Sequence, residues 1–326
     1  MKTNMKSGNH NHLRQKGLTL IELLISMVVM LLIMAGLVSA FISHNSISSA
    51  EAARMEVQQD LRVAVDRLKN VLRNAGYGCH ASFAEGNTMI GTEPQGGSIT
   101  IGSSISHISN QKSVGTDINS DSLITAYGFK NVGKTVDDDA LNADQIKLDK
   151  DPSPSITTGG FKNYLSFFPH PRGNNFFVVT AVDGRKITLS EEVSVEQDTD
   201  VFMVSPSRIE IAEDSGISVL YIKNFAYTSS IHWIVAENII DLQFQYFIPG
   251  QGWQDEPSLS DVNQQKIRKI RFWVLGKSRE KVPNAGQQQF QVEDPETQEI
   301  IYQVGPFNDG HIYMISQGEV ALRNAR

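Results

Sequence analysis

Residues 23–41 read LLISMVVMLLIMAGLVSAF, an apolar run without a charged side chain. Acidic and basic residues stay absent until Glu51. A helix of about 20 apolar residues is long enough to cross the roughly 30 Å hydrocarbon layer of a bilayer. The run therefore predicts one membrane-spanning helix near the amino terminus.

The residues before this run carry only positive charge. Residues 1–17 read MKTNMKSGNHNHLRQKG, with cations at Lys2, Lys6, Arg14 and Lys16. Cationic flanks of a membrane span stay in the cytoplasm, so we expect the amino terminus inside the cell and the remaining chain outside the inner membrane. That exported part is acidic, since the whole chain already has a net charge of −7 with those cations included.

Glu22 lies among apolar residues at the start of the span. A charge in a membrane helix costs about 2.5–3.5 kcal/mol at the bilayer centre and less near its edge, so it is rarely left without a partner. A secretory signal also begins with cations and an apolar stretch, but that stretch is short and ends at a small-residue cleavage site. The length of this run favours a retained helix, in which Glu22 requires a cationic partner.

The segment KGLTLIE at residues 16–22, together with the apolar run, resembles the class III signal of type IV pilins and pseudopilins. The resemblance implies that a prepilin peptidase cleaves after Gly17, that Leu18 becomes a methylated amino terminus, and that Glu22 pairs with the amino terminus of a neighbouring subunit to set the axial register. The family usually has Phe where this chain has Leu18, a departure tolerated in minor pilins and pseudopilins. The alternative is a plain single-pass anchor with a chance Glu.

From Glu51 to Ala75 the pattern becomes amphipathic, and Gly76 supplies a helix stop. We expect one helix in two parts, a transmembrane and assembly segment at residues 18–42 and an amphipathic continuation at residues 43–76. Its apolar stripe is expected to pack on a sheet. The residues of that stripe are Val57, Leu61, Ala64, Val65, Leu68, Val71, Leu72 and Ala75.

Residues 77–326 are predicted to form a globular head. Residues 77–122 are rich in Ser, Gly, Asn and Thr, which indicates a loop-rich transition with one short strand near 98–101. Two hairpins are expected at 176–189, with a turn at Asp183–Gly184, and at 208–222. Further strands are predicted at 123–127, 145–148, 239–247, 267–275, 299–304, 312–316 and 319–322. The expected fold class is α+β: a long N-terminal membrane-spanning helix packed on a mostly antiparallel, β-rich globular head of the pilin-like kind.

Two segments of the head, DLQFQY at 241–246 and IRKIRFWVL at 267–275, resemble the C-terminal half of PilW-like minor pilins. The resemblance implies a minor pilin that joins other minor pilins and the major pilin at the inner-membrane assembly platform, primes a type IV pilus and sits at its tip, with a tip adhesin as a further candidate partner. The head would be periplasmic and later lie at the cell surface. Two alternatives stay open: a J-type minor pseudopilin of type II secretion, and an anchored enzyme or receptor domain with a pilin-like signal.

Neither a catalytic nor a metal-binding motif stands out. A net charge of −7 argues against nucleic acid as a partner. The single cysteine, Cys79, cannot form an intramolecular disulfide. The acidic run at residues 137–139, with Asn142 and Asp144, lacks the Gly and the terminal Glu of an EF-hand and is interpreted as a solvated loop. We expect no enzyme activity, no cofactor and no metal. The histidines considered, which lack metal-ligand spacing, are His80, His107, His170, His232 and His311.

Overall fold

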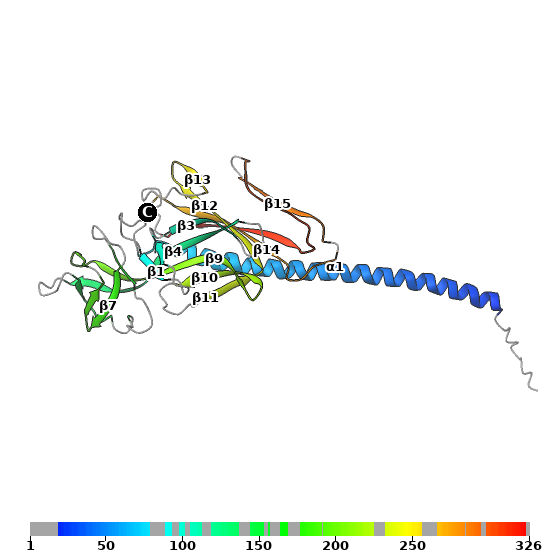
Figure 1. Cartoon of the computed structure of the whole chain (residues 1–326), viewed down its shortest axis with the longest axis horizontal. Coiled ribbons are helices and arrows are strands. Elements are labelled where there is room, and N and C mark those ends of the chain that lie inside the picture. The colour runs from blue at the N-terminus through cyan, green and yellow to red at the C-terminus, as the bar shows by residue number, and fades with distance from the viewer. Residues whose placement is uncertain are drawn as a thin grey trace, which may run out of the picture. The chain divides into compact units, whose positions relative to one another are not determined.

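The computed structural model describes residues 19–78, 89–92, 98–101, 105–112, 119–136, 144–152, 156, 164–168, 177–190, 192–224, 232–255, 266–283, 285–294 and 298–323. In these residues one long helix precedes a large antiparallel β-rich head, which confirms the α+β fold class (Figure 1). The chain divides into two compact units, residues 1–51 and 52–326.

Helix α1 spans Leu20–Asn74. In the first unit its apolar side chains are exposed, and this segment is long and apolar enough to cross a membrane once. In the second unit the predicted stripe is buried, apart from the half-buried Val71. Gly76 has a φ of 78° and follows the helix, as the expected stop requires.

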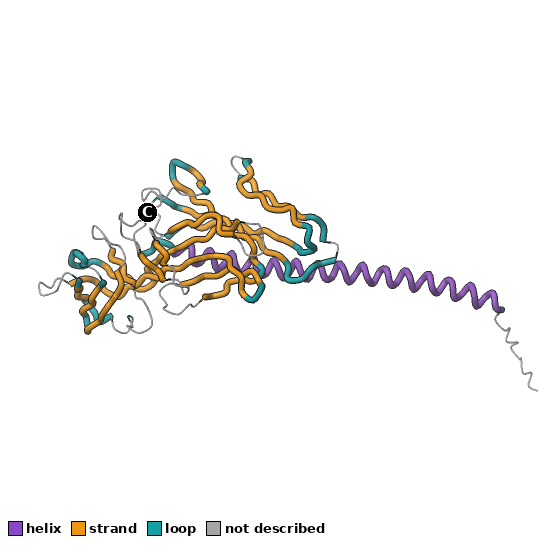
Figure 2. The backbone as a smooth tube through the Cα atoms, in the orientation of Figure 1, coloured by secondary structure: helices purple, strands orange, loops and turns teal. Residues whose placement is uncertain are grey.

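The described strands are β1 (Met89–Thr92), β2 (Ser98–Ile101), β3 (Ile105–Lys112), β4 (Asn119–Val136), β5 (Gln145–Leu148), β6 (Tyr164–Phe168), β7 (Phe177–Asp183), β8 (Lys186–Leu189), β9 (Asp200–Asp214), β10 (Ile217–Asn224), β11 (His232–Glu237), β12 (Ile239–Ile248), β13 (Gly252–Gln254), β14 (Lys269–Lys277), β15 (Gln288–Glu293), β16 (Ile300–Phe307) and β17 (Tyr313–Ala321). They form a sheet of order β11-β10-β9-β6-β7-β8-β5-β4-β3, a sheet of order β13-β12-β14-β17, and the pairs β1-β2 and β15-β16. Figure 2 shows the strands in orange and the helix in purple. The segment 77–122 therefore contains more strand than the one that composition predicted.

The main core lies between α1 and the two larger sheets. Leu68 and Leu72 of the helix are fully buried in one cluster with Phe244 of β12 and Phe272 of β14. Strand β14 approaches the helix closely at Gly276, where an added Cβ would lie 3.3 Å from the side chain of Leu61. The amphipathic stripe therefore packs on a sheet, as predicted.

The carboxyl end of α1 is held by residues distant in sequence. The backbone N–H of Gly76 donates to the carbonyl of Ala126 at 2.9 Å, and that of Arg323 donates to the carbonyl of Arg73 at 3.2 Å. The Arg323 guanidinium lies 4.8 Å from the centre of the Tyr77 ring. The last carbonyls of a helix have no donor within the helix. The C-terminal segment of the chain therefore supplies a donor to one of these carbonyls.

Six strands of the larger sheet close into a barrel. Strand β9 pairs with both β6 and β4, and β5 pairs with both β8 and β4, which gives the ring β4-β9-β6-β7-β8-β5. Its interior is filled by a second apolar cluster, separate from the main core, in which Phe167 and Phe177 meet edge to face at 5.3 Å. The other buried members are Val132, Ile146, Leu148, Ile156, Leu165, Ile187, Leu189, Val201 and Met203. The barrel is thus a packed insert and not a channel.

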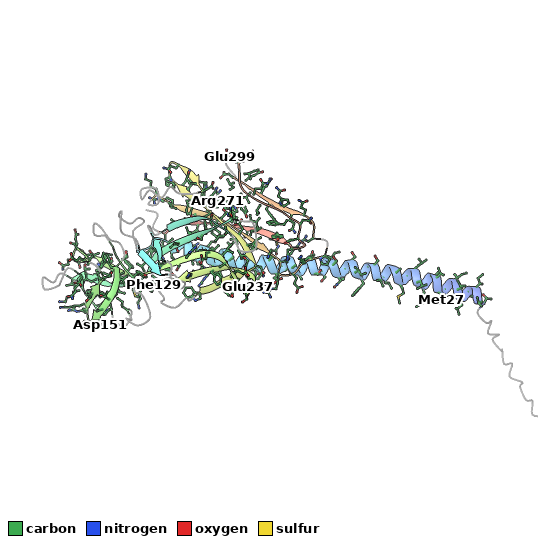
Figure 3. All side chains as sticks on the ribbon, viewed as in Figure 1. Met27, Phe129, Asp151, Glu237, Arg271 and Glu299 are labelled. Atoms are coloured by element: carbon green, nitrogen blue, oxygen red, sulfur yellow. The ribbon has the colours of Figure 1, made fainter. Side chains whose placement is uncertain are left out.

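The pair β15-β16 forms an arm over the outer face of the four-stranded sheet. Tyr302 stacks on Trp273 with ring centres 6.4 Å apart and donates a hydrogen bond to the Asp241 carboxylate. Arg271, labelled in Figure 3, forms a buried ion pair with Asp294 at 3.4 Å. A small apolar cluster, which includes Leu275 and Val304, completes the contact. The arm is therefore attached by polar as well as apolar contacts.

The Asp241 carboxyl makes the stability of the head depend on pH. Burial raises its pKa, against the opposing hydrogen bonds from Tyr302, Gln243 and Leu242. Because the folded chain then binds this proton more tightly than the unfolded chain, the free energy of unfolding falls as the pH rises above the ordinary carboxyl range. Asp241→Asn removes this titration, so we expect a flatter profile of stability between about pH 4 and pH 7 in urea unfolding.

The matched control for this pH experiment is Asp183→Asn, which removes an exposed carboxylate at the end of β7. It is expected to retain the wild-type slope of unfolding free energy against pH. A wild-type slope in Asp241→Asn as well would contradict the role given to Asp241.

Candidate functional site

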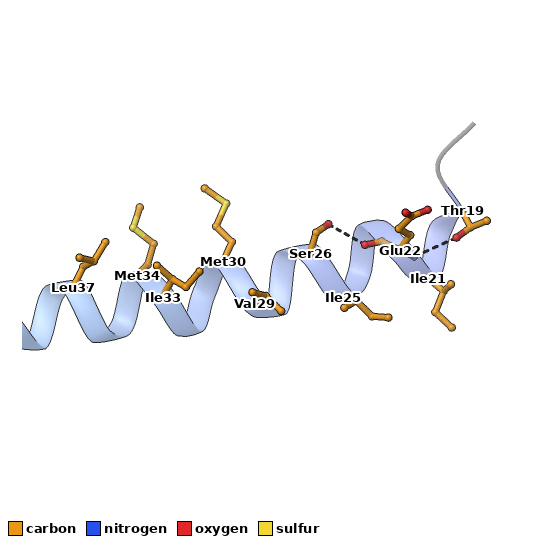
Figure 4. Close-up of a pocket in the computed structure, with 10 residues that line it drawn as sticks. All are labelled: Thr19, Ile21, Glu22, Ile25, Ser26, Val29, Met30, Ile33, Met34 and Leu37. Atoms are coloured by element: carbon orange, nitrogen blue, oxygen red, sulfur yellow. Dashed lines mark hydrogen bonds between the residues drawn. The ribbon is translucent and has the colours of Figure 1, made fainter. Parts of the chain in front are cut away.

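The candidate site is the amino-terminal turn of α1. The carbonyl of Thr19 accepts hydrogen bonds from the backbone N–H of Glu22 at 3.0 Å and of Leu23 at 3.2 Å. The Thr19 hydroxyl oxygen also accepts from the Glu22 N–H, at 3.4 Å (Figure 4). Thr19 is therefore the N-cap of the helix, and Glu22 occupies the third helical position, which is the spacing of a capping box.

The Glu22 carboxylate itself is exposed. The hydrogen bonds of Glu22 within the described chain involve its backbone, since its N–H bonds to Thr19 and its carbonyl accepts from the Ser26 hydroxyl at 2.9 Å. A carboxylate in the first turn also lies at the positive end of the helix dipole. Among the described residues none forms an ion pair with Glu22, so the counter-charge that a membrane position requires is not supplied by this part of the chain.

An apolar strip follows Glu22 along one side of the helix. Figure 4 shows its side chains at spacings of three and four residues, with a single polar member, Ser26, beyond Glu22. Because one helix forms it, the strip is an open surface that suits lipid or another apolar helix. Its apolar residues are Ile21, Ile25, Val29, Met30, Ile33, Met34 and Leu37.

Of the predicted site residues, Glu22 is placed in the first helical turn, whereas Gly17 and Leu18 lie outside the described residues. Cys79, the acidic run at 137–139 and two of the histidines, His80 and His170, also lie outside them. In the part of the chain that is described, no group of three or more His, Cys, Asp or Glu side chains is arranged to hold a metal. His311 is placed beside a backbone carbonyl, with its Nδ1 atom 2.8 Å from the oxygen of Ser278.

The capping role of Thr19 was not predicted from the sequence. The signal that reveals it is the spacing Thr-x-x-Glu directly before an apolar run, which is typical of a helix start. The first turn thus combines a cap, a charge without a described partner and an exposed apolar strip.

A comparison with known proteins finds a family motif that includes this turn. A family model described as the prokaryotic N-terminal methylation motif matches residues 12–38, a range that includes Gly17, Leu18 and Glu22. Neither a curated protein nor a solved structure matches the chain. The motif supports a type IV pilin-like or pseudopilin precursor, a structural and not an enzymatic kind of protein. It implies a substrate of prepilin peptidase in a pilus or membrane assembly context, and with the apolar helix it indicates a single membrane anchor.

Proposed function

We propose that this chain is a PilW-like minor pilin that primes assembly of a type IV pilus and sits at its tip. The observation that carries the proposal is the methylation motif at residues 12–38, which continues into an exposed apolar helix. The finer assignment is supported by the head, because the segments at 241–246 and 267–275 that resemble PilW-like proteins fall largely on β12 and β14, which pair with each other.

In this proposal residues 1–17 are a leader that remains in the cytoplasm. Prepilin peptidase hydrolyses the bond between Gly17 and Leu18, and the new Leu18 amine is methylated. Residues 18–42 then serve first as the inner-membrane anchor and later as the assembly helix, residues 43–76 continue it, and the head lies in the periplasm.

Assembly moves the apolar helix from lipid into a bundle of similar helices. This transfer changes little in the surroundings of the apolar strip, because lipid chains and neighbouring side chains are alike in polarity. The exception is Glu22, whose carboxylate pairs with the Leu18 amine of a neighbouring pilin and so selects one axial register. Other minor pilins, the major pilin and the inner-membrane platform are the partners, with a tip adhesin as a further candidate.

Processing by prepilin peptidase is the first test. Coexpression of the full-length precursor with the enzyme is expected to remove 17 residues and leave a methylated Leu18 amino terminus, measured by gel shift and by mass spectrometry of the terminal peptide. An inactive peptidase variant serves as the control. A chain that retains residues 1–17 in the presence of active enzyme would overturn the proposal.

The finer assignment needs a second readout, because the methylation motif is shared with pseudopilins of type II secretion. The processed subunit is expected in sheared pili, and its deletion is expected to reduce piliation while secretion continues. Loss of secretion with normal piliation would assign the chain to a pseudopilus instead.

A further inference from the structure

We propose that the arm β15-β16 is a flap, hinged at its base, that opens while the rest of the head stays folded. An open flap uncovers Arg271 and Trp273 on the outer face of β14, so the flap controls when these two side chains can be reached from solvent. The inference goes beyond the proposed function, because it concerns the head alone and does not depend on how the leader is processed.

The arm is attached firmly where the chain leaves and rejoins the sheet. The backbone N–H of Ser278 donates to the carbonyl of Ile312 at 2.7 Å. The side-chain oxygen of Gln288 accepts the backbone N–H of Tyr313 at 2.9 Å, and the Phe307 and Tyr313 rings stack with their centres 4.0 Å apart. Gln288 begins β15 and Phe307 ends β16, so these contacts form the base of the arm.

Beyond this base the arm is loosely packed. Every side chain of β15 is exposed or half-buried, and Val304 is the one buried residue of β16. The two strands pair with each other and with no other strand of the described chain, and Glu299 lies near the far end of the arm (Figure 3). A two-stranded hairpin is only marginally stable in water by itself, and a region with few buried apolar contacts opens more readily than a core. The arm is therefore expected to leave the sheet without unfolding the main core.

The contacts beyond the base are few and lie together. Tyr302 donates a hydrogen bond to the Asp241 carboxylate and stacks on Trp273. Asp294 pairs with Arg271 at 3.4 Å, which is longer than the 2.7–2.9 Å usual for a hydrogen bond between charged groups. Because these contacts all join the arm to the same face of the sheet, one movement about the base breaks them together.

The closed flap also leaves two polar atoms beneath it without hydrogen bonds. Arg271 and Trp273 are 6% and 2% exposed, and within the described chain neither Nε of Arg271 nor Nε1 of Trp273 has a hydrogen-bond acceptor. The Arg271 Nε atom lies 3.8 Å from the Glu319 carboxylate, which is beyond hydrogen-bond distance. A buried donor without an acceptor costs free energy, and water restores its hydrogen bond when the flap opens. The closed state is thus weakened at the two residues that the arm contacts.

Labelling of single cysteines on the two faces of β14 tests the inference. In a Cys79→Ser background, Leu275→Cys places a thiol in the apolar cluster beneath the arm, which includes Val304. Val274→Cys places one in the main core, on the opposite face of the same strand. The native side chains are 1% and 0% exposed, so a thiol reagent reaches either position only after opening. The full chain in detergent is treated with excess maleimide under native conditions, and the rate of modification is measured by mass spectrometry.

We expect Leu275→Cys to react at least about tenfold faster than Val274→Cys, because the first requires opening of the flap alone and the second requires unfolding of the core. Equal rates would overturn the inference. Leu275→Cys itself removes an apolar contact from the arm, so hydrogen exchange of the unmodified chain is the second measurement. The amides of β15 and β16 should exchange at least about tenfold faster than those of β12 and β14. Exchange of arm and sheet at one common rate would overturn the inference as well.

Two tyrosine substitutions locate the hinge. Tyr302→Phe removes the hydrogen bond to Asp241 that only the closed flap makes, and should speed labelling of Leu275→Cys about three- to tenfold. Tyr313→Phe is the matched control, since its hydroxyl donates to Asp309 at 2.7 Å within the base, which the open flap retains. It should leave that labelling rate within about twofold of the parent. Equal acceleration by both substitutions would show that the base opens with the arm, which contradicts a hinged flap.

Discussion

Glu22→Gln and Glu22→Ala are expected to be inserted and processed normally but recovered in sheared pili at about one tenth of the wild-type level or less. In the proposed assembly the Glu22 carboxylate meets a neighbour's amine in apolar surroundings. Removal of one partner from a buried ion pair costs about 3–5 kcal/mol, because the other charge stays buried without compensation. The measurement is immunoblotting of the subunit in pilus and membrane fractions.

The two substitutions at Glu22 separate the effect of its charge from the effect of a polar side chain at the third helical position. Gln is accepted at the third helical position of a capping box, so Glu22→Gln preserves the turn that Thr19 begins and removes only the charge. If both variants fail alike, the charge is what assembly requires. If Glu22→Gln assembles normally and Glu22→Ala does not, a disturbed first turn of the helix explains the assembly defect. The proposed ion pair is then contradicted.

A control on the same helix guards against a general effect of lost charge. Glu51→Gln also removes an exposed carboxylate from α1, at the first acidic residue after the apolar run. It is expected to assemble like the wild type. Wild-type levels of Glu22→Gln in pili would exclude the proposed pairing whatever the control shows.

Leu68→Ala is expected to destabilise the head by about 2–5 kcal/mol, the usual range for deletion of a buried leucine side chain. Leu68 is fully buried where α1 packs on the sheets, in the cluster that also contains Phe244 and Phe272. Urea unfolding of the processed chain in detergent, followed by tryptophan fluorescence, measures the loss.

All three tryptophans of the chain lie outside the barrel, on β11, β13 and β14. Their fluorescence therefore reports unfolding of the part of the head that contains Leu68 and not of the barrel. The matched control is Val63→Ala, since Val63 lies on the same stretch of helix but is 48% exposed. It is expected to change the free energy of unfolding by no more than about 0.5 kcal/mol. Equal effects of the two substitutions would show that α1 is not packed as described.

Hydrophobic spacing and turn residues correctly predicted the elements that depend on neighbouring residues in the sequence. The burial of the helix stripe follows from spacing alone, and the β9–β10 turn follows from Ser215 and Gly216, whose φ angles are 53° and 83°. The β7–β8 turn was predicted one residue too early. Asp183 pairs with Lys186, so the two turn residues are Gly184 and Arg185.

Long-range contacts account for the rest. Two strands were predicted at 312–316 and 319–322, yet one strand, β17, runs through Gly318. Gly318 lies opposite Phe272, and an added Cβ would come within 2.2 Å of the Phe272 ring, so this glycine makes room for a ring and does not end a strand. Similarly, closure of the barrel depends on pairing between β4 and β9, which local periodicity does not encode.

In the candidate site, too, local sequence patterns predicted some features and could not predict others. Gly17, Leu18 and Glu22 were assigned their roles from a family resemblance carried by a cationic leader, a glycine, a glutamate and an apolar run. They fall within the matched range 12–38, and their individual roles stay predictions. The N-cap at Thr19 could have been predicted from the sequence, because Thr19 and Glu22 have the spacing of a helix start. The counter-charge for Glu22 came only from the family resemblance, because the proposed partner belongs to another molecule, and it stays a prediction.

The way in which the barrel joins the main sheet determines which changes the head is expected to tolerate. Its first and last strands leave the main sheet side by side, since Gly128 of β4 pairs with Val204 of β9. A segment whose two ends coincide can be lengthened, shortened or replaced while the scaffold keeps its own core, as with any domain inserted between neighbouring points of a host. We therefore expect that changes within the described part of the barrel leave the packing of α1 on the four-stranded sheet unaltered, since the two apolar clusters share no residue.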